Sequence, residues 1–192
     1  MKLNIFIIII TAIFLLHGCL TASILGTSAI AIKSFSDPRT IGRQIDDMTL
    51  TLNVNGMINK NKEIAKYSNV NVTAYKGIIL LTGQSLNIKL IRLISYIVKT
   101  VEGVEIIYNE IRLDNKITLK TAIYDSMITA LIKLKIFNSK IINLSSIKVI
   151  TENHEVFLLG VVTKSVGAKV AKIASETHGV KLVTTIFSYI DK

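Results

Sequence analysis

The sequence contains the same pattern twice, and this internal repeat is the strongest constraint on its fold. The segment from Val70 to Gly83 aligns with the segment from Ile147 to Gly160 at an offset of 77 residues. Blocks before and after it repeat at offsets of 78 and 76. The matching residues are Asp47, Leu50, Val54 and Ile58 with Asp125, Ile128, Ile132 and Ile136, and Gly103-Val104 with Gly179-Val180. Because the offset drifts by only one residue from block to block, we infer two homologous modules, residues 46–114 and 118–190.

Both modules predict the same order of elements. Apolar residues at every fourth position predict a first helix, and the acidic residue before them suits a helix N-terminus. Two apolar-rich strands follow, joined by tight turns at residues 75–77 and 152–154. Ser85 and Thr163 are placed to cap a second helix, which ends at Gly103 or Gly179, and a last strand follows at 104–113 or 180–190.

The predicted fold class is therefore α+β. Each αββαβ module forms a mixed three-stranded sheet, covered on one face by two helices. A module of about 70 residues has only a marginal core, so we expect the two modules to support each other by docking.

The N-terminal residues predict the compartment. Lys2 precedes an apolar run over residues 5–16, which as a helix would rise about 18 Å, short of the roughly 30 Å hydrocarbon core of a bilayer. A basic residue, a short apolar core and then small residues are typical of a secretory signal peptide, here residues 1–18. An alternative is a transmembrane anchor, because residues 20–32 are again fairly apolar.

The residues Leu16-His17-Gly18-Cys19 resemble the bacterial lipobox, in which cleavage precedes a cysteine that carries diacylglycerol. His17 departs from the small residue usually found there. Cys19 is the single cysteine of the chain, which excludes a disulfide framework and a Cys-cluster zinc site. In enteric-type bacteria, an aspartate directly after the lipidated cysteine resembles an inner-membrane retention signal. This chain has Leu20 at that position, so we expect outer-membrane localisation. Residues 19–45 are then the lipidated cysteine and a flexible tether.

Two such modules behind a lipobox resemble the dual BON-domain outer-membrane lipoproteins, which are related to the osmotically inducible periplasmic BON proteins. The resemblance covers nearly the whole chain after Cys19 and is sharpest at residues 37–47, 71–75, 108–112 and 151–153. It implies a periplasm-facing lipoprotein that maintains the outer-membrane barrier and recognises anionic phospholipid through its second module. It also implies a link to the machinery that assembles outer-membrane β-barrels.

The formal charge of +10 is unevenly distributed. Residues 46–114 hold eight Lys or Arg against seven Asp or Glu, whereas residues 115–192 hold eleven against five. A basic balance is typical of proteins that meet nucleic acid or an anionic membrane. An AT-rich genome would also enrich lysine, but it should affect both modules alike.

The first helix of the second module carries a second apolar stripe beside its core stripe. Its members are Met127, Ala130, Leu131, Leu134 and Phe137, where the first module has Thr49, Leu52, Asn53, Gly56 and Asn59. At 100° per residue, Lys133 and Lys135 border this stripe. We expect Met127, Leu131, Leu134 and Phe137 to insert into a membrane, with Lys133, Lys135 and Lys140 as phosphate contacts. The alternative is that the second stripe packs against the first module.

Other function classes find little support. His154 sits in a predicted turn, His178 in the last turn of a helix, and Asp46-Asp47 at a helix N-terminus, so we expect no catalytic site. No nucleophile-elbow, zinc-protease or phosphate-loop pattern occurs in the sequence. We also expect no cofactor, metal or small-molecule substrate. Nucleic acid is not expected, because Gly-x-x-Gly clamps and stacking aromatics are missing. A protein scaffold without lipid recognition remains the alternative.

The lipobox makes a direct prediction. Cells grown with radiolabelled palmitate should label the native protein, and Cys19→Ser should abolish the label because the acylated sulfur is lost. A native chain that takes up no label would contradict both the lipid anchor and the localisation.

Overall fold

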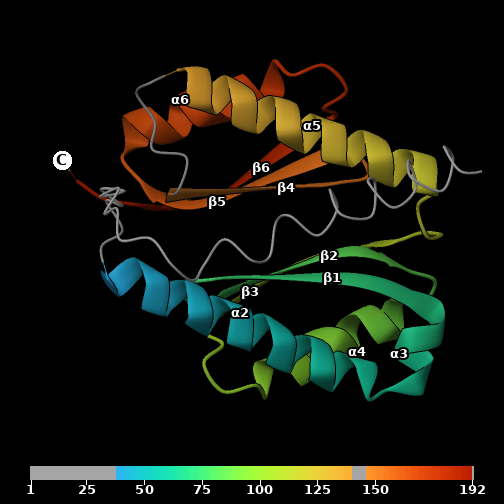
Figure 1. Ribbon diagram of the computed structural model, residues 1–192. Coiled ribbons are helices and arrows are strands. Elements are labelled where there is room, and N and C mark those ends of the chain that lie inside the picture. Colours follow the sequence, from blue (N-terminus) through green and yellow to red (C-terminus); the bar gives the residue numbers. More distant parts are fainter. Residues whose placement is uncertain (1–37, 140–145, 192) are drawn as a thin grey trace, which may run out of the picture. The chain divides into compact units, whose positions relative to one another are not determined.

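The computed structural model describes residues 38–139 and 146–191. Residues from Asp37 onward form one compact unit, and it contains two three-stranded sheets (Figure 1). Cys19 and Lys140 lie outside the described residues. Within the described ranges, no helix combines the length and the apolar character needed to cross a membrane.

The two modules have the predicted topology. The first comprises α2 (Pro38–Asn59), α3 (Lys62–Tyr67), β1 (Ser68–Tyr75), β2 (Ile78–Ser85), α4 (Ile88–Lys99) and β3 (Ile106–Leu113). The second comprises α5 (Leu119–Asn138), β4 (Ile147–Glu152), β5 (Glu155–Val162), α6 (Lys164–Ser175) and β6 (Leu182–Tyr189). The middle strand of each sheet, β2 or β5, pairs antiparallel with the strand before it and parallel with the strand after it. The α+β class and the mixed sheets are confirmed, and the short helix α3 is an addition.

Two helix starts differ from the expectation. Helix α2 begins at Pro38, within the stretch expected to be tether, and proline suits a first helical turn because its missing N–H is not needed there. Asn87 caps α4 by accepting from the Lys89 amide at 2.8 Å. Ser85 is buried instead, with its Oγ 2.8 Å from that of Ser68. Thr163 caps α6 as predicted.

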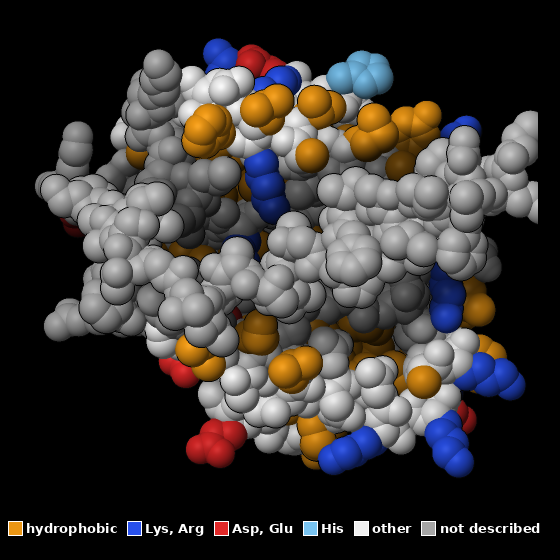
Figure 2. Space-filling view, viewed as in Figure 1, with side chains coloured by type: hydrophobic (Ala, Val, Ile, Leu, Met, Phe, Trp, Pro, Cys, Tyr) orange, Lys and Arg blue, Asp and Glu red, His pale blue; other side chains and the backbone are white. Residues whose placement is uncertain are grey.

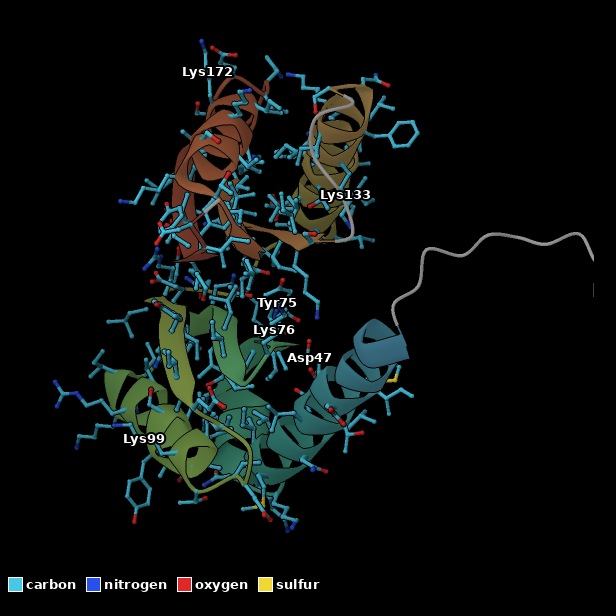
Figure 3. The ribbon with its side chains drawn as sticks, turned by 90° about the vertical axis from the view of Figure 1, so that its left-hand side faces the viewer. Asp47, Tyr75, Lys76, Lys99, Lys133 and Lys172 are labelled. Carbon is cyan, nitrogen blue, oxygen red and sulfur yellow. The ribbon has the colours of Figure 1, made fainter. Side chains whose placement is uncertain are left out.

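The two hairpin turns are held by buried aspartates. Lys76-Gly77 and Asn153-His154 form two-residue turns in which all four residues have positive φ, as a type I′ turn requires. Asp47 accepts from the Lys76 amide at 2.6 Å, and the two residues lie side by side in Figure 3. Asp125 accepts from both turn amides of the second hairpin, at 2.7 and 2.8 Å.

This arrangement corrects the predicted role of the aspartates. Neither Asp47 nor Asp125 stands at a helix N-terminus, because α2 begins at Pro38 and α5 at Leu119. Both point from within their helix to the hairpin. The same correction applies to the Asp46-Asp47 pair. A non-glycine residue with positive φ costs roughly 1–2 kcal/mol, and a charged acceptor for its amide offsets that cost.

The middle strands are buried on both faces. In β2, Ile79 and Leu81 belong to the core beneath the helices of the first module, whereas Ile78 and Leu80 belong to a separate cluster between the sheets. In β5 the same alternation assigns Val156 and Leu158 to the helix side and Phe157 and Leu159 to the cluster between the sheets. Helices therefore cover the outer face of each sheet, and the sheets cover each other (Figure 1). The expected docking of the modules is confirmed.

Polar contacts fix how the sheets meet. Glu152 is buried and accepts from Asn71 at 3.0 Å and from Gln84 at 2.6 Å, both in the first module. Arg112 donates from Nε to Glu155 Oε2 at 3.2 Å, and this hydrogen bond raises the pKa of the Arg112 guanidinium. Tyr75, labelled in Figure 3, donates to the Ser146 carbonyl at 3.0 Å, and burial raises the pKa of its hydroxyl. A buried carboxylate with two amide donors favours one register over others.

The turn contacts predict a large difference between neighbouring carboxylates. Asp125→Ala should lower the free energy of unfolding by about 3 kcal/mol, because two turn amides lose a charged acceptor. Asp46→Ala, at an exposed position, should change it by no more than about 0.5 kcal/mol. Urea unfolding followed by circular dichroism measures both. Equal effects would show that the carboxylate does not hold the turn.

Candidate functional site

Helix α5 is apolar on two opposite sides. Ile128, Ile132 and Ile136 are buried in the core of the second module. On the other side, the large members of the second stripe are exposed: Met127 by 55%, Leu131 by 45%, Leu134 by 55% and Phe137 by 67%. Figure 2 shows hydrophobic side chains gathered along α5. The helix thus presents to solvent the residue types that a soluble protein normally buries.

The second stripe extends further along the helix than the sequence analysis recognised. Leu119, Ile123 and Tyr124 are also large, apolar or aromatic, and exposed. At 100° per residue they fall on the same arc as Met127 and Leu134, so the helical wheel would have found them if it had been drawn from the start of α5. The exposed apolar surface therefore follows nearly the whole helix.

The alternative that the second stripe packs against the first module is wrong for the described residues. The modules dock through their sheet faces, where Leu80, Phe157 and Leu159 meet. Helix α5 lies on the outer face of its sheet (Figure 1). The first module therefore does not cover the second stripe.

The lysines beside the second stripe differ in their surroundings. Lys133 is exposed at one border (Figure 3). Lys135, at the other border, donates to Thr177 Oγ1 at 3.1 Å and to the Glu176 carbonyl at 3.4 Å. It therefore stabilises the end of α6, where backbone carbonyls carry partial negative charge. The sequence placed Lys135 at the border correctly but could not show this contact, because Thr177 lies 42 residues away.

The first module carries only part of this apolar surface. At the positions that match Met127, Leu131, Leu134 and Phe137, helix α2 has Thr49, Asn53, Gly56 and Asn59. Its exposed apolar residues are Ile45, Met48, Leu52 and Met57. Of these, Ile45 and Leu52 match Ile123 and Ala130 of α5. Helix α2 is therefore also apolar on part of its outer side, but four large exposed residues of the second stripe, Met127, Leu131, Leu134 and Phe137, have polar or glycine counterparts in the first module.

His154 and His178 lie in loops of the second module. His154 forms the second residue of the β4–β5 turn, and its Nδ1 lies 3.2 Å from the Gly179 carbonyl. His178 is exposed and lies past the end of α6 at Ser175, not in its last turn as expected. In the part of the chain that the structure describes, no three His, Cys, Asp or Glu side chains gather as metal ligands do.

A scan against family models matches the BON domain twice, at residues 46–115 and 124–189. The chain belongs to the BON-domain family. Its modules coincide with the two sheets and their helices, so the resemblance noted from the sequence is confirmed.

Two relatives align with most of this chain. One is the outer membrane lipoprotein DolP of Haemophilus influenzae, 40% identical over 96% of this chain and 95% of that protein. Another is the 21 kDa hemolysin of Actinobacillus pleuropneumoniae, 35% identical over 80% of this chain and 79% of that one. Among solved structures, the C-terminal domain of CdsD, from the type III secretion system of Chlamydia trachomatis, has 15% identity. It covers 76% of this chain and 67% of that one with a TM-score of 0.30, too low to inform function.

The relationship to the Haemophilus lipoprotein confirms the predicted localisation. The match extends over nearly both complete chains, so it includes the N-terminal residues that resemble a lipobox. The protein is a lipid-anchored protein of the outer membrane with two BON domains.

The contact of Lys135 predicts a stability effect that Lys133 should not share. Lys135→Met keeps the aliphatic stem but removes the ammonium group from the end of α6, and it should lower the free energy of unfolding by about 0.5–1 kcal/mol. Lys133→Met should change it by less than about 0.5 kcal/mol. Thermal unfolding of the two variants tests this, and identical midpoints would assign Lys135 no structural role.

Proposed function

We propose that the protein is a non-enzymatic, periplasm-facing lipoprotein that binds anionic phospholipid through its second BON domain and helps to maintain the outer membrane. The observation that carries the proposal is the exposed second stripe of α5 with lysines at its borders. Met127, Leu131, Leu134 and Phe137 would enter the headgroup layer, and Lys133 would meet lipid phosphates.

The energetics favour such a role. Burying a large apolar side chain contributes roughly 1.5–3 kcal/mol, so four of them support binding even after ordering costs. A lysine near an anionic surface adds about 1 kcal/mol, and salt weakens this part. Lys135 remains in the proposal as a weaker phosphate contact, since its ammonium group is shared with the end of α6. Lys140 stays a prediction.

The architecture makes the binding compatible with a folded protein. Ile128, Ile132 and Ile136 hold α5 on the sheet, while the opposite side of the same helix carries the second stripe. Membrane contact would therefore require no opening of the core. Because acyl chains on Cys19 would already anchor the protein, the second stripe is free to serve recognition of lipid composition.

A second candidate function is an accessory role in outer-membrane β-barrel assembly, through protein contacts without lipid recognition. The first module favours it, because it is nearly neutral and exposes Ile45, Met48 and Leu52 on α2. Crosslinking that captures barrel-assembly subunits equally well with the native chain and with Phe137→Asp would support this alternative.

The second stripe predicts a specific loss of membrane binding. Phe137→Asn and Leu134→Asn should each weaken binding of residues 37–192 to phosphatidylglycerol vesicles by at least about tenfold, because burial of a large apolar side chain is lost. Leu52→Asn in α2, at a position 65% exposed in the native chain, is the matched control and should change binding by less than about twofold. Co-sedimentation at low and high salt measures these affinities.

Three results would contradict the proposal. Native protein that does not sediment with anionic vesicles would contradict lipid binding altogether. Equal losses for Leu52→Asn and Phe137→Asn would contradict the assignment to α5. Binding to phosphatidylcholine vesicles as strong as to phosphatidylglycerol would contradict the role of the lysines.

A further inference from the structure

Strand β6 has one open edge. It pairs with β5 on one side, and among the described residues no strand pairs with it on the other (Figure 1). The Ile190 amide donates to the Val162 carbonyl at 3.1 Å, and the residues that bond to a neighbouring strand alternate along the chain. Thr185 and Phe187 therefore direct their backbone N–H and C=O groups away from β5. Such a row of groups is a template for pairing with a further strand.

The corresponding edge of the first module, on β3, is protected. Asn109 Oδ1 accepts from the Ile111 amide at 3.1 Å and so occupies an N–H that would otherwise be available for a further strand. Glu110 and Arg112 place charges on the same strand, and charged side chains are a common means of keeping an edge strand from pairing.

The second module carries none of these protecting residues on β6. Asn109, Glu110 and Arg112 correspond, at an offset of 76, to Thr185, Ile186 and Ser188. The whole strand, Leu182–Tyr189, contains neither a charged residue nor proline, and most of its residues are β-branched or aromatic, which favours strands. Since β3 shows that the fold tolerates a protected edge, the open edge of β6 is not needed for folding.

The pattern along β6 suits antiparallel pairing with itself. If a two-fold axis passes through Ile186, the outward-directed residues meet in hydrogen-bonded pairs, with Thr185 opposite Phe187 and Val183 opposite Tyr189 of the second copy. Both pairs join an aromatic to a β-branched side chain, a combination that stabilises neighbouring strands. The strand is therefore complementary to a second copy of itself.

Charges at the two ends of β6 select the same register. Lys181 and Asp191 are exposed and lie five residues before and after Ile186. In the two-fold pairing, Lys181 of each copy stands opposite Asp191 of the other, and opposite charges across a strand pair stabilise it. A shift of the register by two residues would separate these charges.

We propose that two copies of the protein pair through the open edge of β6 and form a continuous sheet across their second modules. A two-fold contact is closed, so the assembly stops at two copies. The contact area is small, but the lipid anchor holds the copies in one membrane plane and raises their effective concentration. Pairing is therefore a property of the anchored protein and not of dilute soluble fragments.

The test is a disulfide crosslink that reports the register. Thr184 and Ser188 of the second copy form a non-hydrogen-bonded pair, whose short Cβ–Cβ separation suits a disulfide. Full-length Thr184→Cys and Ser188→Cys, with different tags, are produced in the same cells, and outer membranes are analysed on non-reducing gels. We expect a mixed disulfide-linked dimer. Neither variant alone should crosslink, because equal positions lie about 13 Å apart along the strands.

Further variants test the backbone and the end charges in this crosslinking background. Thr185→Pro removes an outward N–H and should lower the crosslink yield at least about tenfold, whereas Thr185→Val keeps the N–H and should change it less than about twofold. Lys181→Glu and Asp191→Lys should each lower the yield at least about fivefold. The double charge reversal should restore it, because the opposite charges again face each other. Circular dichroism checks that each variant is folded.

The result of the mixed pair decides the proposal. Absence of the mixed dimer, or equal dimers from either variant alone, would overturn the two-fold pairing. A crosslink of Ser188→Cys to a different protein in place of the mixed dimer would assign the edge to that partner and also overturn it. Phe137→Asn should leave the crosslink yield within about twofold, because the pairing does not involve the second stripe. The pairing and the proposed lipid recognition are therefore tested separately.

Discussion

The packing of the two sheets against each other decides which surfaces of this protein remain for function. Phe157 and Leu80 are fully buried between the modules, and Glu152 sets their register by accepting from Asn71 and Gln84. Since the sheet faces are used in this contact, helices α2 and α5 keep their outer sides exposed. Without it, the apolar inner faces of both sheets would compete with the second stripe for any apolar partner.

The repeat separates what the fold requires from what this chain adds. The aspartate that holds the hairpin turn, the mixed sheet and the loop glycine occur in both modules, at matching positions. The exposed Met127, Leu131, Leu134 and Phe137 of α5 occur in one module only, because α2 has polar residues or glycine at the matching positions. Residues of the first kind explain stability, and residues of the second kind are the ones to which we assign recognition.

Much of the fold could be predicted from the sequence because the repeat aligns two independent copies of each signal. The apolar-rich strands were predicted as β2 and β5, and the tight turns predicted at residues 75–77 and 152–154 contain the two-residue turns of the structure. The roles of Asp47 and Asp125 were not predicted, because the backbone amides that donate to these carboxylates lie 29 and 28 residues further along the chain. For the site, helical periodicity located the second stripe, whereas the contact of Lys135 with Thr177 needed the end of α6 to be placed beside α5. Local patterns carry no information on such distant contacts.

The early start of α2 has a consequence for how the anchor and the folded part work together. Only residues 20–37 separate Cys19 from Pro38, a length that can extend at most about 60–65 Å. A short connection raises the effective concentration of the second stripe at the surface that holds the anchor. Under the proposed function, the affinity of the second stripe for lipid could therefore be weak, about millimolar, and contact would still be frequent. Weak, tethered contact exchanges quickly, so the proposed recognition would follow changes in lipid composition without holding the folded part in place.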